Sequence, residues 1–292
     1  MRDLHTHLKL SPSGLATVQN CLHKARYVYQ EGLRTKEDKA RFGEGTLTHA
    51  ILEAVFKGGA TIDQGYEVAQ LAADSGRWDR TPTKAQIAGA YRRAKAAFSL
   101  FSDIHPEYEI VSCEGEVSGI HPEDPTIEMT GRVDLLIHEP RGYFLYDWKT
   151  TTSPPKGGRR GWDPDFVPHY AGNTQATHYC ALLGADGKPV TWAGELQVKG
   201  PSFSSDGEPL EYFVGRVQTT PSPRALEVHL QAVLDVAQRL RAEPLASDRT
   251  LGSCFSFGAY CEHGALCAAD LEGDFVSAEL LRERWREDNI GD

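Results

Sequence analysis

The chain has 292 residues, of which 40 % are hydrophobic and 25 % are charged. This length and mixture are typical of a globular protein that buries its core without disulfide bonds, and they exclude a disordered or fibrous chain. Because 41 acidic residues outnumber 31 basic ones, giving a net charge of −10, bulk attraction to nucleic acid is excluded and any such contact must be local.

The first hundred residues are predicted to be helical. A helix over residues 15–29 follows Ser11-Pro12-Ser13, because a serine cap followed by proline is typical of a helix start. A second helix begins after Gly43-Glu44-Gly45, and a third covers residues 83–101. The second is supported by apolar residues at helical spacing, namely Leu47, Ile51, Leu52, Val55 and Phe56.

The pattern then changes to alternating strands separated by turns that contain Pro and Gly. A meander of three short strands is expected at residues 108–117, 127–138 and 142–150. Residues 151–169 contain too much Gly and Pro for regular structure, and loops of this length are usually functional or mobile. The rest is predicted as a helix at 169–183, strands at 190–198 and 211–217, a helix at 223–241 and a short charged helix at the C-terminus.

The termini and the cysteines bear on the cellular compartment. The N-terminus has no apolar segment of signal-peptide type, and no stretch approaches the roughly 20 apolar residues that span a bilayer. We therefore expect a cytoplasmic protein without membrane association. The cytosol keeps thiols reduced, so the six cysteines are not expected to form disulfides. Three of them cluster near the C-terminus, which indicates metal ligation.

Two aspartates and a lysine stand out in the strand region. Asp134 interrupts the apolar strand Gly131 to Ile137, where a buried unpaired carboxylate costs several kcal/mol and therefore needs a cation. In the next strand, the two-residue period places Asp147 and Lys149 on one face and Trp148 on the other.

Two interpretations fit this pattern. Carboxylates on adjacent strands hold Mg²⁺ or Mn²⁺, and a lysine beside them orients or deprotonates the attacking water and offsets transition-state charge, which suits phosphodiester hydrolysis. Taken alone, an Asp-x-Lys pattern is as well explained by an exposed cross-strand ion pair, worth about 0.2 to 1 kcal/mol. The neighbouring motifs favour the first interpretation.

Four segments resemble the RecB-like branch of the PD-(D/E)XK nuclease superfamily, in the family's order. They are Leu10-Ser11-Pro12-Ser13-Gly14-Leu15 leading to Cys21, Gly45-Thr46-Leu47-Thr48-His49-Ala50-Ile51-Leu52-Glu53, Asp134 followed by Asp147-Trp148-Lys149, and Gln175-Ala176-Thr177-His178-Tyr179. The resemblance spans roughly residues 8–270, and its specificity comes from the joint order of motifs that are weak individually.

The resemblance implies a restriction-endonuclease-like α/β core, a central mixed sheet flanked by helices, with a helical N-terminal region and a C-terminal cysteine cluster. It also implies that His49, Asp134, Asp147 and the Trp148 carbonyl bind metal. Gln175 and Tyr179, four residues apart on one helix face, would steady Lys149 or the DNA backbone. An extra acidic ligand is available in Glu114 or Glu116, between which the sequence does not choose.

The resemblance extends to the cysteines. Iron–sulfur nucleases of this family, including CRISPR adaptation and AddB-type enzymes, use four thiolates, which here would be Cys21, Cys254, Cys261 and Cys267, in a structural [4Fe-4S] cluster. Six residues separate Cys254 from Cys261, more than the two of the relatives, so zinc, an altered cluster and unligated thiols remain alternatives. His263 is a possible substitute ligand.

The loop after the catalytic strand is the predicted DNA contact. Lys156, Arg159 and Arg160 could hold phosphates while Trp162 stacks on an unpaired base, although a solvated glycine-rich loop explains them equally well. We expect one nuclease domain over residues 1–292. Its predicted parts are a helical region at 8–105, a core at 106–241 and a cysteine segment at 250–270 that packs on the first helix.

The predicted function is a metal-dependent DNA nuclease, most simply an exonuclease, in recombination, repair or CRISPR or phage DNA processing in a bacterial or phage-infected cell. Its expected partners are single-stranded DNA or duplex ends and a recombination or CRISPR adaptation protein, with no nucleotide cofactor. The alternative is a non-cleaving DNA-binding or scaffold subunit of a helicase or recombinase complex. All three of Asp134, Asp147 and Lys149 are present, which favours the enzyme.

Overall fold

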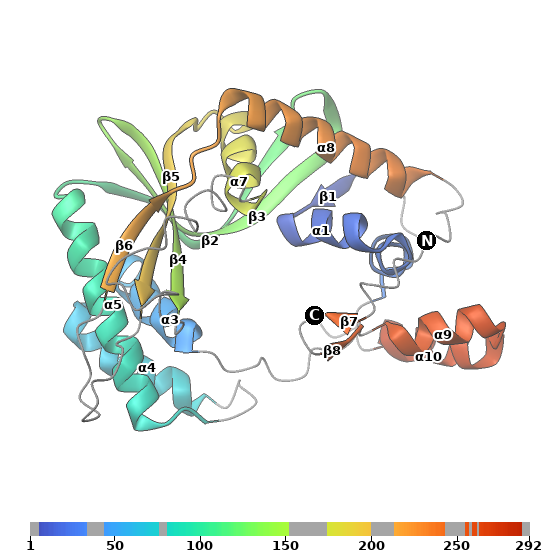
Figure 1. Ribbon diagram of the computed structural model, residues 1–292, viewed down its shortest axis with the longest axis horizontal. Coiled ribbons are helices and arrows are strands. Elements are labelled where there is room, and N and C mark those ends of the chain that lie inside the picture. Colours follow the sequence, from blue (N-terminus) through green and yellow to red (C-terminus); the bar gives the residue numbers. More distant parts are fainter. Residues whose placement is uncertain are drawn as a thin grey trace, which may run out of the picture. The chain divides into compact units, whose positions relative to one another are not determined.

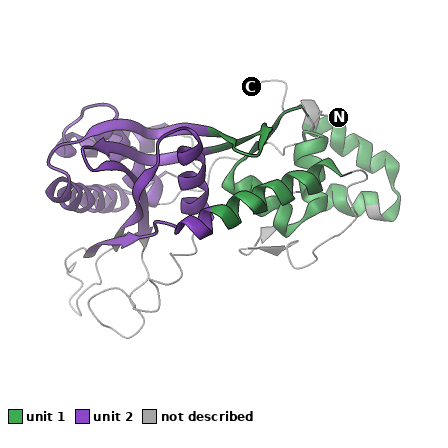
Figure 2. Cartoon of the chain, turned by 90° about the horizontal axis from the view of Figure 1, so that it is seen from above, with its two compact units in different colours: residues 1–38, 119–130, 227–292 green, residues 39–118, 131–226 purple. Residues whose placement is uncertain are grey.

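The computed structural model describes residues 6–33, 44–75, 81–151, 174–199, 213–242, 255–256, 259–261 and 263–287. It forms two compact units (Figure 2). Residues 39–118 and 131–226 make the central unit, and residues 1–38, 119–130 and 227–292 make the terminal unit. The predicted division into a single domain with three parts stays a prediction.

A mixed sheet of six strands organises the fold (Figure 1). Its order is β1-β3-β4-β5-β6, with β2 paired to β3. The pairs β1·β3 and β4·β5 are parallel, whereas β3·β4 and β5·β6 are antiparallel. The strands are β1 (Leu8–Leu10), β2 (Glu109–His121), β3 (Asp124–Glu139), β4 (Gly142–Thr151), β5 (Val190–Lys199) and β6 (Phe213–Gln218). The predicted mixed sheet flanked by helices is confirmed.

The helices of the central unit are α3 (Glu44–Phe56), η2 (Ile62–Gln64), α4 (Gly65–Asp74), α5 (Lys84–Ile104) and α7 (Thr174–Ala185). Capping explains where α5 begins, because Thr83 and Gln86 satisfy each other's backbone N–H groups in a capping box. α3 and α5 agree with the predicted second and third helices. The sequence pattern missed η2 and α4, because the small residues Ala69 and Ala73, rather than large apolar ones, form the buried face of α4.

One face of the sheet is covered by α3 and α5, and α4 packs against these two helices. Alternate residues of β4 point into this core, where Trp148 stacks on Phe56 at 5.7 Å between ring centroids and Tyr146 meets Phe101 edge-on at 5.3 Å. Buried His105 contacts both Glu139 and the Tyr146 hydroxyl. With Tyr146 and Trp148 fixed in the core, the residues between and after them must face the other side of the sheet.

The terminal unit contains α1 (Pro12–Asn20), α2 (Leu22–Ala25), η1 (Arg26–Gln30), α9 (Gly264–Glu272), α10 (Phe275–Glu287), most of α8 (Pro223–Arg241) and the two-residue strands β7 (Phe255–Ser256) and β8 (Ala259–Tyr260). Leu8 pairs with Ile127 where β1 joins β3. Arg241 at the end of α8 bonds the Asp124 carboxylate at 2.8 Å.

α9 and α10 pack on the N-terminal helical segment. Their shared apolar cluster consists of Tyr27, Leu33, Leu266, Ala269, Ala278 and Trp285. Polar contacts reinforce it, since the Tyr27 hydroxyl donates to Asp270 at 2.6 Å and Arg282 donates to Glu31 at 2.7 Å. α9 and α10 therefore share a small hydrophobic core with the N-terminal helical segment.

Several predicted boundaries were wrong. The helix expected at 15–29 is broken at Cys21, which is extended with φ −158° and caps α2 by accepting the Lys24 N–H on its sulfur. β2 and β3 are 13 and 16 residues long rather than short. The pattern missed β1, β7, β8 and α9. α8 has the predicted bounds, and α10 is the expected charged helix.

The predicted loop at 151–169 lies outside the described residues except for Thr151, and so does the beginning of the helix predicted at 169–183. Within the described part of the chain, no helix is both long and apolar enough to cross a membrane.

Candidate active site

The site begins with the two strands that carry the aspartates. Asp134 of β3 accepts a hydrogen bond from the Trp148 backbone N–H of β4, with 2.7 Å between Oδ2 and N. The aspartate therefore reaches across to the strand that carries Asp147 and Lys149. The sequence placed these residues on adjacent strands, and the structure brings them together.

A histidine and a glutamate complete a cluster around Asp134. His49 of α3 places Nδ1 3.0 Å from Glu114 Oε1 and 3.8 Å from Asp134 Oδ2, and places Nε2 3.0 Å from the Trp148 carbonyl oxygen. One ligand atom each from His49, Glu114 and Asp134 lies within 4.8 Å of the others. We call these three residues the ligand triad.

Glu114, rather than Glu116, joins the site. Glu114 is half-buried and its side chain is 11 % exposed, whereas Glu116 is exposed. The Glu114 backbone has φ +44°. This left-handed conformation costs a non-glycine residue about 1 to 3 kcal/mol, and contacts with the surrounding structure must offset that cost. Here Oε1 is held by His49 and Oε2 by Arg132 Nε at 3.1 Å. The two-residue strand period of the sequence does not predict a left-handed residue at this position.

The charges of the triad are strongly coupled. Burial is the main cause that raises the pKa of Asp134 to about 7, and the nearby Asp147 carboxylate adds to it. Burial opposes protonation of His49, but the Glu114 and Asp134 carboxylates outweigh it and raise the His49 pKa. Burial also works against the Glu114 anion, yet His49 and Arg132 lower its pKa overall. The triad concentrates negative charge that a cation would relieve.

Asp147 and Lys149 form an ion pair beside the triad. Lys149 Nζ lies 2.6 Å from Asp147 Oδ2. Burial disfavours the ammonium, but Asp147, Asp134 and Glu195 together raise the Lys149 pKa. Lys149 therefore carries a positive charge next to the cluster of carboxylates.

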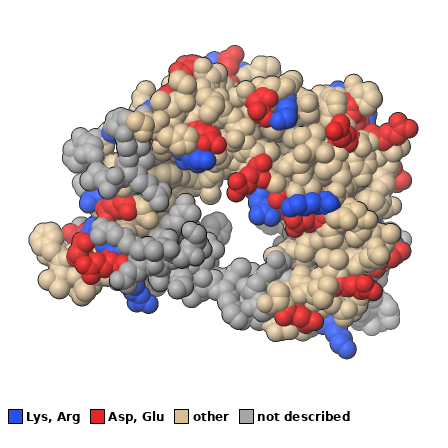
Figure 3. All heavy atoms as spheres, turned by 180° about the vertical axis from the view of Figure 1, so that it is seen from behind, with Lys and Arg blue, Asp and Glu red and all other residues tan. Residues whose placement is uncertain are grey.

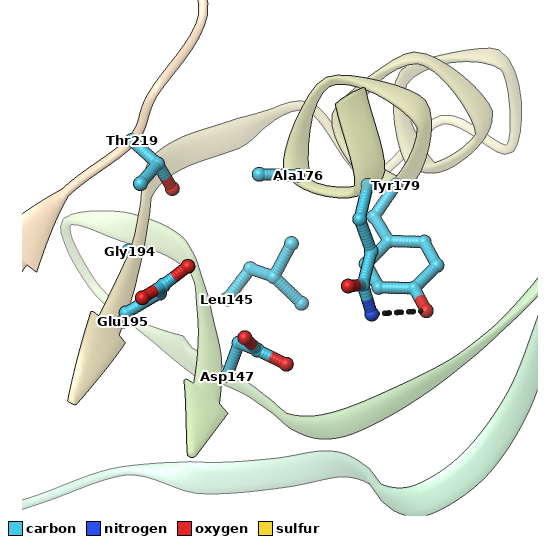
Figure 4. Close-up of a pocket in the computed structure, with 8 residues that line it drawn as sticks. Leu145, Asp147, Ala176, Tyr179, Gly194, Glu195 and Thr219 are labelled. Carbon is cyan, nitrogen blue, oxygen red and sulfur yellow. Dashed lines mark hydrogen bonds between the residues drawn. The ribbon is translucent and has the colours of Figure 1, made fainter. Parts of the chain in front are cut away.

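A pocket opens between β4, β5 and α7 next to this ion pair (Figure 4). Asp147 and Glu195 both border it. Gln175 Nε2 donates to the Tyr179 hydroxyl at 3.0 Å, so these predicted partners bind each other at the wall of the pocket. The full lining is Leu145, Asp147, Gln175, Ala176, Tyr179, Gly194, Glu195 and Thr219.

Two positions in this region escaped the sequence argument. Glu195 is 1 % exposed and pairs with Asp147 across the parallel strands β4 and β5. A Cβ at Gly131 would lie 2.3 Å from Tyr179 Cε1, so only glycine lets β3 approach that ring. A glutamate within the segment Ala193 to Leu196, whose other residues are Ala, Gly and Leu, was a signal that could have revealed Glu195.

The other predicted site residues are not part of this cluster. Cys21, Cys261 and Cys267 belong to the terminal unit, are half-buried and form no disulfide with a described residue. Among the described residues, the one group of three possible metal ligands is the ligand triad. His263 is buried and stacks on Tyr27. Cys254 and the predicted DNA contacts, Lys156, Arg159, Arg160 and Trp162, lie outside the described residues.

The donor atoms of the triad fit a divalent cation. Carboxylate oxygens suit Mg²⁺ and Mn²⁺, and one imidazole nitrogen is compatible with Mn²⁺. The Trp148 carbonyl oxygen lies 3.0 Å from His49, and the Asp147 carboxylate acts electrostatically on Asp134. On the face shown in Figure 3, acidic and basic side chains are interspersed.

The model of the PD-(D/E)XK nuclease superfamily matches residues 9–268, which include the whole of this site. The chain belongs to this superfamily. Membership in the PD-(D/E)XK superfamily implies a metal-dependent nuclease.

Two solved structures are similar to this PD-(D/E)XK chain. The crystal structure of SSO0001 is 13 % identical, covers 80 % of this chain and 87 % of its own, and has a TM-score of 0.29. The crystal structure of LHK-Exo in complex with dAMP is 13 % identical, covers 68 % of this chain and 91 % of its own, and has a TM-score of 0.29. A comparison with curated proteins finds no match.

Proposed function

We propose that the protein is a Mg²⁺- or Mn²⁺-dependent deoxyribonuclease that hydrolyses phosphodiester bonds, acting as an exonuclease on single-stranded DNA or duplex ends. The observation that carries the proposal is the ligand triad, with its ligand atoms within 4.8 Å of one another, directly beside the Asp147–Lys149 ion pair.

Each residue has a role in this proposal. His49, Glu114, Asp134, Asp147 and the Trp148 carbonyl would hold the cation, which supplies a Lewis acid and a water of low pKa. Lys149 orients the attacking water and offsets negative charge on the phosphate in the transition state. Gln175 and Tyr179, which are hydrogen-bonded to each other at 3.0 Å, contact the DNA backbone and help to position it.

The biological setting is part of the proposal. A cytoplasmic nuclease of this kind would serve recombination, repair or CRISPR or phage DNA processing, with a recombination or CRISPR adaptation protein as partner. Support comes from the superfamily match and from the residues of the site. Lys156, Arg159, Arg160 and Trp162 are proposed to contact DNA.

We also propose that Cys21, Cys254, Cys261 and Cys267 bind a [4Fe-4S] cluster, as in the iron–sulfur branch of the RecB-like nucleases, with zinc as the alternative metal. In support, Cys267 lies in α9 and packs against the apolar cluster that joins α9 to Tyr27 and Leu33. Iron, acid-labile sulfide and zinc contents of anaerobically purified protein distinguish the two metals. Absence of all three would refute the cluster without touching the nuclease site.

Cleavage of end-labelled DNA tests the nuclease proposal. Linear and circular substrates, single- and double-stranded, are incubated with Mg²⁺, Mn²⁺ or EDTA and with Asp147→Ala and Lys149→Ala variants. We expect metal-dependent cleavage that both variants lose, with circles spared. Binding without cutting would instead favour a scaffold subunit of a helicase or recombinase, and equal cutting by the variants would refute the assignment.

A further inference from the structure

Arg132 is an exposed cation attached to the ligand triad. It lies on β3, two residues before Asp134, and its side chain is 63 % exposed. Its Nε donates to Glu114 Oε2 at 3.1 Å, and the opposite oxygen of the same carboxylate contacts His49. Glu114 thus joins Arg132 to the ligand triad through a single carboxylate.

The rest of the guanidinium is available for a ligand. An arginine has five N–H donors in one plane, and the bond to Glu114 uses the one on Nε. In the described part of the chain, the two terminal nitrogens of Arg132 make no hydrogen bond or ion pair. Their four N–H groups form a fork of the kind that matches a phosphate.

The carboxylates around the ligand triad repel a DNA strand, so a cation at this place favours DNA binding. Glu114, Asp134, Asp147 and Glu195 are all carboxylates of this region, and the site's lysine, Lys149, is paired with Asp147 at 2.6 Å. A DNA strand that approaches the triad meets this negative charge, and the chain's net charge of −10 does not offset it. A cation at the rim with unused donors reduces that repulsion where the substrate must bind.

We propose that Arg132 binds a phosphate of the DNA backbone at the ligand triad, through its terminal nitrogens, while its Nε stays on Glu114. This inference rests on the proposed nuclease function and adds a substrate-binding residue to it. The contact reads no base, so it holds DNA of any sequence in place for hydrolysis.

The salt dependence of DNA binding tests the contact directly. Each phosphate contact adds about 0.7 to 0.9 to the slope of log K against log salt concentration. Oligonucleotide binding is followed by fluorescence anisotropy at several salt concentrations and saturating Mn²⁺, in an Asp147→Asn background that prevents cleavage. We expect Arg132→Gln to reduce the slope by that amount and to weaken binding about tenfold, and Arg132→Lys to restore the slope.

Arg92→Gln is the matched control, because Arg92 is an exposed arginine of α5 and its removal changes the net charge equally. The salt-dependence slope of Arg92→Gln should equal that of the parent, which is the Asp147→Asn protein without a further substitution. If Arg132→Gln also leaves the slope unchanged, the inference is overturned, and weaker Mn²⁺ binding by calorimetry would then assign Arg132 to holding Glu114. Failure of the parent to bind DNA, together with failure of the wild type to cleave it, would instead refute the nuclease proposal and this inference with it.

Discussion

Glu195 of β5 pairs directly with Asp147 of β4 in the parallel register of the two strands. Both residues line one pocket, and Glu195 is 1 % exposed. Because Glu195 is buried, water screens the interaction between its charge and the proposed metal site only weakly. We expect Glu195→Gln to weaken Mn²⁺ binding about tenfold in calorimetric titrations, by loss of Coulomb attraction. An unchanged Mn²⁺ affinity would show that the proposed metal does not sense this carboxylate.

Glu114 and Glu116 offer a matched pair of substitutions in one strand. Glu114→Gln removes a charged oxygen from the ligand triad, so we expect Mn²⁺ affinity and kcat/KM for DNA cleavage to fall about 100-fold. Glu116→Gln alters an exposed residue two positions away and should leave both within about twofold. Equal losses in the two variants would argue against a ligand role for Glu114.

The sequence was sufficient for the residues whose chemistry depends on local spacing. Strand periodicity predicts that Asp147 and Lys149 share a face, and Trp148 does pack in the opposite core. Most long elements followed from hydrophobic periodicity, whereas the mixed sheet was an implication of the family resemblance. Helix α8 has its predicted bounds, because it begins at a proline and has an amphipathic face.

The choice between Glu114 and Glu116, which the sequence left open, and the role of Glu195, which it missed, depend on contacts between distant elements. Glu114 differs from Glu116 through its left-handed backbone and through bonds to His49 and Arg132, none of which a two-residue period reveals. Glu195 becomes relevant only when β5 pairs in parallel with β4. Sequence patterns give strand faces, but the pairing register decides which faces meet.

The pH dependence of stability should reveal the cost of the metal-free triad. The folded state raises the pKa of Asp134 from 3.8 to about 7, so its protonated form is favoured on folding. The associated stability is complete below about pH 4 and is lost as pH rises through 7. Between pH 5 and 8, wild type in EDTA should lose about 2 to 3 kcal/mol more than Asp134→Asn in urea unfolding.

Metal provides the complementary measurement. Mn²⁺ at about 100 times its Kd should restore about 2.7 kcal/mol to wild type at pH 8, and much less to Asp134→Asn, which lacks a charged ligand. Parallel pH profiles of the two proteins in EDTA would contradict the raised pKa. Equal Mn²⁺ stabilisation of both would contradict metal ligation by Asp134.

Arg282 supports the terminal unit through two carboxylates. Its Nε donates to Glu31 Oε2 at 2.7 Å, its Nη2 donates to Asp270 Oδ2 at 2.7 Å, and its side chain is 12 % exposed. Arg282→Met removes one partner from each of these half-buried carboxylates and leaves Glu31 with Arg26 and Asp270 with the Tyr27 hydroxyl. We therefore expect it to destabilise the protein by about 1 to 3 kcal/mol in urea unfolding. Arg282→Lys should lose less, because it keeps the charge but not the planar fork.

The control is Arg284→Met, an exposed arginine of the same helix, which should cost less than about 0.5 kcal/mol. Adding Asp270→Asn to Arg282→Met should cost less than Asp270→Asn alone, because the guanidinium that pairs with Asp270 is then already absent. Equal effects of Arg282→Met and Arg284→Met would contradict the pairing. Since Arg282 contacts Glu31 and Asp270 directly, the Arg282→Met loss should persist in protein freed of iron and zinc by chelation.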